Sequence, residues 1–159
     1  MRAQNNRIER DSGKAAADGV PTGAVRPRHW AQYEGRMKNI LLVGVGGFIG
    51  TVFRYKTGGL ILHHTVNWKF PAGTFLVNCC GCLVAGILMA LAVKQDFFSP
   101  STRLLLFTGI LGGFTTFSAF GLETVYLLQR HEIFWAGLYV VLTVSVGIFA
   151  LWMGMSSIR

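Results

Sequence analysis

One run of the sequence combines glycines, hydroxyls and aromatic rings inside a long uncharged segment. It reads GGFTTFSAFGLE and covers residues 112–123. Gly112 and Gly113 lower helix propensity, and the hydroxyls of Thr115 and Thr116 compete for backbone hydrogen bonds. We therefore predict a break in a helix here. In a bilayer, the freed backbone groups must be buried in protein or line a cavity, and freed carbonyls are good ligands for a hard cation such as Na⁺.

Two phenylalanines and a glutamate follow the predicted break. Phe117, Phe120 and Glu123 are spaced three residues apart, so they share one helical face. A phenyl ring has a positive edge, and two such edges can face a small anion without holding it too tightly to leave. Packing in the core or against lipid is the alternative role for the two rings.

Polar residues in two other apolar segments repeat a helical spacing. Thr74 precedes Asn78 by four residues, and Tyr139 precedes Thr143 by four. Residues at this spacing lie on the same helical face. An asparagine in lipid is costly without a partner, so Asn78 either makes an interhelical hydrogen bond or acts as a donor along a polar track.

Arg54 lies late in the first apolar segment, between Phe53 and Tyr55. Its guanidinium could reach the membrane interface while its stem stays in lipid. The other interpretation is an intramembrane cation that attracts anions or braces a dimer. The sequence leaves both open.

Small residues elsewhere favour helix packing over chemistry. Gly46 and Gly50 form a GxxxG pattern, which lets helix backbones approach closely. The surrounding GVGGFIG lacks the spacing and the βαβ context of a dinucleotide-binding turn. Cys79, Cys80 and Cys82 lack the second cluster expected of a metal site, so we expect them to pack between helices.

The elements that must position these residues are membrane helices. Only 14% of the 159 residues are charged and 52% are hydrophobic, which is too little charge for an ordinary soluble surface. Three segments have no Asp, Glu, Lys or Arg and reach the roughly 18 apolar residues of a membrane span. With a shorter first segment, they predict an all-α membrane protein with four helices. We expect these at 39–62, 71–94, 101–130 and 133–157.

The polar front of the chain differs from the rest. Residues 1–36 lack apolar periodicity, and we expect a disordered extension ahead of a four-helix membrane domain at 37–159. The front has no apolar core of a signal peptide. A start of translation at Met37 is an alternative, in which case the front is not part of the native protein.

The basic residues indicate a membrane rather than a nucleic-acid partner. The net charge is +8, but Lys and Arg flank apolar runs as membrane anchors do. From Met37 onward, four basic residues lie on the side of the N-terminus and two on the other. These are Lys38, Lys94, Arg103 and Arg159 against Lys69 and Arg130. So weak a bias permits insertion in both orientations, whereas the basic front would favour a cytoplasmic N-terminus.

Three motifs in this order resemble the Fluc/CrcB fluoride channel family. They are GVGGFIGTVFRY, GTFLVNCCGC and GILGGFTTFSAF, at residues 44–55, 73–82 and 109–120. The resemblance covers residues 37–155. It implies small four-helix subunits with a broken third helix, which form antiparallel, dual-topology homodimers with two fluoride pores in the cell inner membrane.

The resemblance also implies roles for individual residues. Carbonyls of Gly112 and Thr115 from both subunits would hold a central structural Na⁺. The pore set consists of Phe117, Phe120, Asn78, Ser118 and, less closely matched, Thr74, Tyr139 and Thr143; Arg54 and Glu123 match positions near it. Ala119 departs from the family pattern, which has a second threonine there, so no role is carried to position 119.

We therefore expect a passive channel that releases F⁻ from the cytoplasm and is not an enzyme. One alternative is a proton-coupled exporter of cationic compounds, which requires a membrane carboxylate, and Glu123 is the candidate. Another is a membrane assembly subunit that transports nothing, in which the glycines and aromatic residues only pack. Ion flux distinguishes these classes.

Overall fold

A computed structural model describes residues 28–94 and 98–158 of the chain. The chain divides into two units, Met1–Arg36 and Met37–Arg159. Every regular element in the described residues is helical. Four stretches are long and apolar enough to cross a membrane, which confirms the predicted all-α architecture. They are Gly35–Thr65, Ala72–Val93, Pro100–Gln129 and Ile133–Ser156.

Three of the spans are continuous helices, and the third is divided into shorter elements. The continuous helices are α2 (Arg28–Thr65), α3 (Ala72–Lys94) and α7 (Ile133–Ser156). The third span comprises α4 (Pro100–Arg103), the π-helix η1 (Leu104–Leu111), α5 (Gly112–Phe114) and α6 (Phe117–Gln129). The π-helix was not predicted, because an apolar run such as LLLFTGIL has no residue pattern that separates π from α winding.

The first helix begins earlier than predicted. We expected a disordered extension up to residue 36, but α2 starts at Arg28, so that expectation is wrong for residues 28–36. This stretch contains no proline and several good helix formers, and Pro27 immediately precedes it. A helix already formed downstream can therefore continue back to the proline. The rest of the expected extension lies outside the described residues.

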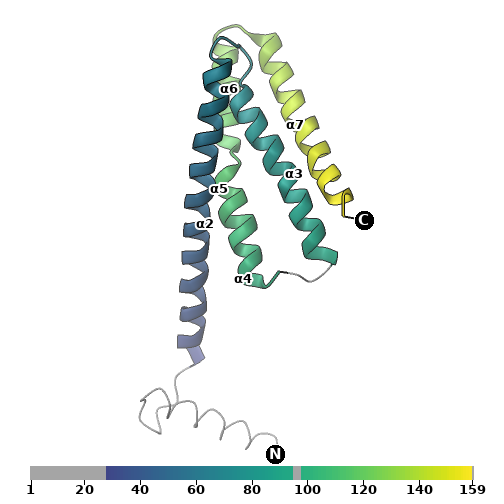
Figure 1. Cartoon of the computed structure of the whole chain (residues 1–159). Coiled ribbons are helices and arrows are strands. Elements are labelled where there is room, and N and C mark those ends of the chain that lie inside the picture. Colours follow the sequence, from purple (N-terminus) through teal and green to yellow (C-terminus); the bar gives the residue numbers. More distant parts are fainter. Residues whose placement is uncertain (1–27, 95–97, 159) are drawn as a thin grey trace, which may run out of the picture. The chain divides into compact units, whose positions relative to one another are not determined.

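Within Met37–Arg159, the connections lie at two ends of a bundle. The α2–α3 connection and the α6–α7 turn are at the same end, and the end of α3 and the start of α4 are at the opposite end (Figure 1). Helix α3 packs closely along α7. A Cβ added at Gly86 would come within 2.1 Å of the Leu151 carbonyl oxygen, and one at Gly154 within 2.4 Å of the Leu83 carbonyl oxygen. Glycine at both positions therefore lets the two backbones touch.

The predicted packing role of the GxxxG pattern is confirmed. A Cβ at Gly46 would lie 2.9 Å from the Cα of Gly109, and a Cβ at Gly50 would lie 2.1 Å from the carbonyl oxygen of Ile110. These contacts bring the first span against the π-helical part of the third. No side chain larger than hydrogen fits between the two backbones at this crossing.

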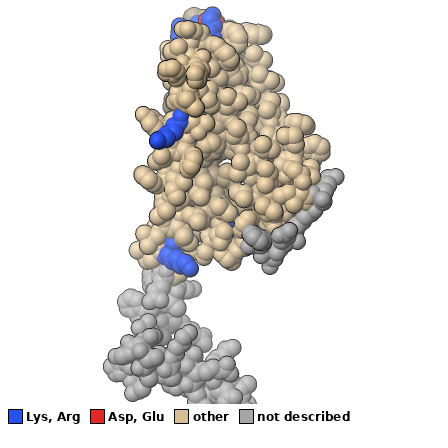
Figure 2. Space-filling model, in the orientation of Figure 1, with Lys and Arg blue, Asp and Glu red and all other residues tan. Residues whose placement is uncertain are grey.

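The surface of the membrane unit is largely apolar. In the face shown in Figure 2, charged side chains lie at both ends and a basic side chain lies between them, and most of the remaining surface is uncharged. Large apolar side chains are exposed on the spans, among them Phe48, Leu122 and Ile148. Such a surface fits lipid or another apolar protein surface, not water.

A small core beside the α6–α7 turn contains the most deeply buried large side chain. Leu127, Ala136 and Tyr139 form this core, and Tyr139 has 0% of its surface exposed. Phe70, Phe75, Phe120 and Trp135 pack around it. Of the cysteines, Cys79 is buried and Cys80 is exposed, so only part of the cluster packs between helices of this chain.

Candidate functional site

The third span is interrupted between α5 and α6. Thr115 has φ −80° and ψ 156°, and Thr116 has φ −149° and ψ 113°, so both have extended backbone. The Thr115 amide still donates to the Leu111 carbonyl, at 2.9 Å. The Thr116 amide does not bond to the carbonyl four residues earlier, as it would in a continuous helix, and instead donates to a side chain of α3.

That side chain is Asn78, and it binds both backbone groups of Thr116. Its Oδ1 accepts from the Thr116 amide at 2.8 Å, and its Nδ2 donates to the Thr116 carbonyl at 3.1 Å. One carboxamide therefore satisfies a donor and an acceptor that the interruption takes out of the helix. This is the interhelical hydrogen bond that the sequence allowed for Asn78. A carboxamide has two N–H donors, so one N–H is left over from this pair.

Two backbone carbonyls lose their helical partners at the same place. In a continuous helix the Gly112 carbonyl would accept from the Thr116 amide, which here bonds to Asn78. The Thr115 carbonyl would accept from the Ala119 amide, which here bonds to the Thr116 hydroxyl at 3.2 Å. These are the two carbonyls that the resemblance predicts as Na⁺ ligands. Their release from the helical ladder fits the needs of a hard cation, which takes oxygen ligands.

The hydroxyl of Thr116 caps the new helix. It accepts from the Ala119 amide and lies 3.2 Å from the Ser118 hydroxyl. This side-chain cap gives a partner to one amide in the first turn of α6 that has no partner within the helix. Ser118 is exposed in the single chain. Ala119 contributes its backbone amide alone, so its missing hydroxyl does not affect the cap.

Gly81 is a residue of this region that the sequence analysis missed. A Cβ at Gly81 would come within 2.3 Å of the Thr115 Cγ2 and 3.3 Å of the Phe114 ring. The interrupted segment therefore depends on a glycine in α3, one turn after Asn78. Among many small residues in this helix, nothing in the sequence distinguishes Gly81.

Three helices bring a carboxylate and two hydroxyls together. The Thr74 hydroxyl of α3 donates to Oε1 of Glu123 at 2.7 Å, and the Tyr139 hydroxyl of α7 donates to Oε2 at 2.7 Å. Glu123 itself lies on α6 and is partly buried. Each carboxylate oxygen thus has a short hydrogen bond from a different helix. Of the four polar residues predicted to form a track, Thr74 and Tyr139 meet at this point, whereas Asn78 binds Thr116 and Thr143 lies outside these hydrogen bonds.

The two phenylalanines lie next to this group. The ring centroids of Phe117 and Phe120 are 5.6 Å apart, and those of Phe120 and Tyr139 are 5.2 Å apart. Phe120 is partly buried, whereas 83% of Phe117 is exposed. In the single chain, the Phe117 ring therefore contacts little beyond Phe120.

Thr143 and Arg54 lie outside these hydrogen bonds. Thr143 follows Tyr139 by one turn of α7, and its buried hydroxyl has no hydrogen-bond partner in the described part of the chain. A buried polar group of this kind calls for an explanation such as an ion or a water. Arg54 is partly exposed on α2, and within residues 28–94 and 98–158 it has no ion pair.

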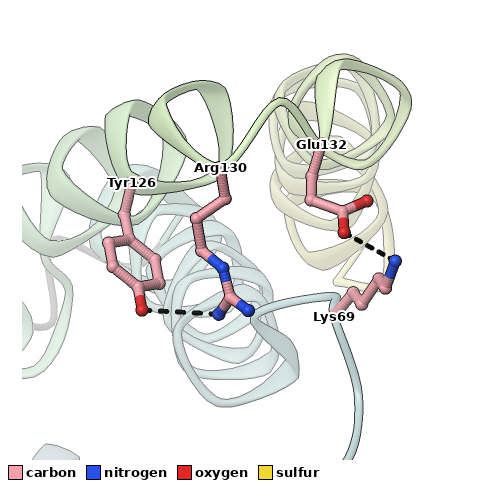
Figure 3. A network of polar contacts seen from close by, with 4 residues as sticks. All are labelled: Lys69, Tyr126, Arg130 and Glu132. Atoms are coloured by element: carbon pink, nitrogen blue, oxygen red, sulfur yellow. Dashed lines mark hydrogen bonds and ion pairs between the residues drawn. The ribbon is translucent and has the colours of Figure 1, made fainter.

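A cavity of about 640 Å³ opens beside Glu123. Thr74 and Glu123 line it, together with Lys69, Arg130 and Glu132 near the ends of the helices. Lys69 forms an ion pair with Glu132 at 2.6 Å, and Arg130 approaches the Tyr126 hydroxyl at 3.4 Å (Figure 3). The cavity therefore leads from charged side chains at one end of the bundle to the carboxylate that Tyr139 and Thr74 hold.

Comparison with known proteins matches most of the chain. The family model described as CrcB-like protein, Camphor Resistance (CrcB) matches residues 41–155. A protein of Methylobacillus flagellatus named Fluoride-specific ion channel FluC is 47% identical over 123 residues, which are 77% of this chain and 96% of the relative.

Proteins of two other organisms are also similar. One from Flavobacterium psychrophilum with the same name is 42% identical over 75% of this chain and 95% of its own length. Fluoride-specific ion channel FluC 1 of Methanosarcina acetivorans is 43% identical over 74% of this chain and 88% of its own length. The motifs at 44–55, 73–82 and 109–120 all fall within residues 41–155, which the family model matches. The chain therefore belongs to the CrcB-like family of membrane proteins.

Proposed function

We propose that this protein is a fluoride-specific channel that lets F⁻ leave the cytoplasm passively and so lowers fluoride toxicity. The observation that carries the proposal is the 47% identity to a fluoride-specific ion channel over 96% of that relative. Fluoride enters cells as HF under acid conditions and dissociates inside, so a passive pathway for the anion suffices to release it. The protein performs no chemical step and has no catalytic residue.

Selective passage of fluoride requires replacement of its water shell. Fluoride is small and strongly hydrated, so the pathway must offer donors where water is removed. The donors that we propose for this role are the second N–H of Asn78 and the hydroxyls of Ser118 and Thr143. The hydroxyls of Thr74 and Tyr139 already donate to Glu123. The Thr143 hydroxyl is buried and unpartnered among the described residues, so it is free to turn towards an ion.

The rings of Phe117 and Phe120 supply a weaker form of attraction. Their positive edges attract an anion without the strength of an N–H donor, which allows the ion to move on. Chloride is larger and gains less from closely placed donors, so a narrow apolar pathway excludes it. Selectivity then arises from donor geometry and from pathway size together.

The interruption of the third span is proposed to bind Na⁺. The Gly112 and Thr115 carbonyls from two copies of the chain would hold the ion, which would supply a fixed positive charge and lock the interrupted segment in place. The support is that the helical partners of both carbonyls bond elsewhere. Arg54 is a second candidate cation near the membrane interface.

A second copy of the chain in the opposite orientation is proposed to complete the channel. Phe117 is 83% exposed and Gly112 is exposed in the single chain, although both are proposed to face ions rather than lipid. An antiparallel partner would cover both. The weak charge bias from Met37 onward permits such dual insertion into the inner membrane.

Fluoride efflux from liposomes tests this proposal. Purified protein is reconstituted into liposomes loaded with potassium fluoride, and a potassium ionophore balances charge while a fluoride electrode records release. We expect rapid fluoride efflux without a proton gradient, and no comparable efflux from chloride-loaded liposomes. Protein-free liposomes are the control. Equal chloride and fluoride efflux would refute selectivity. Transport only under a proton gradient would favour an exporter that depends on Glu123.

A further inference from the structure

Phe70 links the wall of the cavity to the buried Tyr139. It lies in the connection between α2 and α3, lines the cavity and is partly buried. Its ring centroid is 5.4 Å from that of Tyr139, at an interplanar angle of 87°. It also meets Phe75, at 5.3 Å and 74°. Both are edge-to-face arrangements, which aromatic pairs favour.

Tyr139 is therefore held between two rings. Phe70 contacts it from the α2–α3 connection, and Phe120 contacts it from α6 at 5.2 Å. The tyrosine hydroxyl lies at the far end of its ring and donates to Glu123 at 2.7 Å. Since a small shift at the base of the ring moves this hydroxyl further, its bond to Glu123 depends on the two neighbouring rings.

Lys69, the residue before Phe70, also attaches the α2–α3 connection to α7. Lys69 forms its ion pair with Glu132, which immediately precedes α7 (Figure 3). Consecutive residues of the α2–α3 connection thus contact α7 at two levels, Glu132 at its start and Tyr139 about two turns further along. The ion pair is exposed and contributes little by itself, so Phe70 provides the buried part of this attachment.

We propose that Phe70 is a positioning residue for ion passage, which keeps the Tyr139 hydroxyl on Glu123 beside the cavity. The inference rests on the proposed function. Phe70 acts through Tyr139 and does not itself contact the ion. Its loss would loosen Tyr139, leave one oxygen of Glu123 without a fixed donor and slow fluoride passage.

The test compares Phe70→Leu with Phe134→Leu in the liposome assay. Phe134 lies in the first turn of α7 at 72% exposure and meets Trp135 edge-to-face, so it is also a phenylalanine in an edge-to-face pair but has no ring contact with Tyr139. We expect Phe70→Leu to slow fluoride efflux about two- to thirteenfold, the range for loss of an aromatic pair, and Phe134→Leu to leave it unchanged. Phe70→Tyr, which keeps a ring, should restore most of the rate.

A double-mutant cycle separates positioning from general packing. If Phe70 acts through the Tyr139 hydroxyl, Phe70→Leu should slow efflux far less in the Tyr139→Phe background than in the wild type. The same cycle is read in thermal unfolding of the detergent-solubilised protein, which does not depend on transport. There, Tyr139→Phe should lower the unfolding midpoint in the wild type and less in the Phe70→Leu background.

The outcomes distinguish this inference from the proposed function. Wild-type protein without fluoride efflux would refute the proposed function, and the unfolding cycle would still decide whether Phe70 positions Tyr139. Efficient wild-type efflux with equal rates in Phe70→Leu would overturn the inference alone. Additive effects in both cycles would also overturn it, because they would show a purely structural role. If Phe70→Leu does not fold, Phe70→Met takes its place in both cycles.

Discussion

The α3–α7 pair and the interrupted third span satisfy their backbone hydrogen-bonding groups in opposite ways. Helices α3 and α7 stay regular, and Gly86 and Gly154 let their backbones touch. In the third span, η1 is π-helical and Thr115 and Thr116 are extended. Both backbone groups of Thr116 bond there to Asn78, and the Ala119 amide bonds to the Thr116 hydroxyl.

The difference shows what irregular backbone in a membrane requires. Lipid offers no hydrogen bonds, so a regular helix needs only small residues to pack, but an interruption needs a polar side chain from a neighbour. Asn78 lowers the free-energy cost of the interruption, because its side chain bonds to the amide and the carbonyl of Thr116. The polar residues around Glu123 also lie beside the third span and not along the Gly86–Gly154 contact.

The largest expected effect comes from removing the support of the interruption. Asn78→Leu would leave an amide and a carbonyl of Thr116 without partners. At about 1–3 kcal/mol for each unsatisfied group, the loss of unfolding free energy would be about 2–6 kcal/mol. We also expect fluoride efflux to be abolished. Thermal unfolding and liposome efflux measure the two effects.

Asn39→Leu is the matched control for this variant, since Asn39 is exposed on α2 and should tolerate leucine. Wild-type stability in Asn78→Leu would mean that the interruption does not depend on the carboxamide.

A smaller effect is expected from overpacking the regular pair. Gly154→Ala places a methyl group 2.4 Å from the Leu83 carbonyl oxygen, so α3 and α7 must separate, at a cost of about 1–3 kcal/mol. Gly137→Ala in the same helix meets no atom within 4 Å and should be neutral or slightly stabilising, because alanine favours helix. Denaturant unfolding of both variants measures this contrast, and equal stabilities would show that the two backbones are not in contact.

Substitution of the two paired phenylalanines should lower the free energy of unfolding to different extents but slow fluoride efflux similarly. Phe120→Ile removes ring contacts with Phe117 and Tyr139, for a loss of about 0.5–1.5 kcal/mol, whereas Phe117→Ile removes a largely exposed ring and should cost less in the single chain. If the ring edges attract fluoride, both variants should slow efflux sharply while they still elute at the wild-type volume from a sizing column. Wild-type rates in both would exclude the ring-edge mechanism but not the channel assignment.

The smallest effect is expected at the surface ion pair. Lys69→Met breaks the ion pair with Glu132. Because the Lys69 side chain is 58% exposed, the loss should lower the free energy of unfolding by less than about 1 kcal/mol. Lys38→Met, at an exposed lysine of α2, is the control. The difference between the two should shrink at high salt, since salt screens exposed charges. A larger effect that is insensitive to salt would point to a packing role for the Lys69 stem.

The sequence by itself determined the four spans and much of the candidate site. Long runs without charge predict membrane helices because lipid excludes charged side chains, and the structure has four helices long and apolar enough to cross a membrane. Gly46 and Gly50 pointed to a close helix crossing that the structure contains. The spacing of Thr74 to Asn78 and of Tyr139 to Thr143 placed each pair on one helical face. What spacing within one helix cannot give is the partner on another helix.

Only the tertiary structure decided those partners. It put Asn78 on the backbone of Thr116, brought Thr74 and Tyr139 to the two oxygens of Glu123, and required glycine at position 81. It also gave Phe70 a place against Tyr139. These contacts join residues far apart in the chain, and their hydrogen bonds and close approaches depend on how the helices are rotated and shifted against one another. Local propensity and periodicity contain no information about that arrangement, because they record only which face each helix presents.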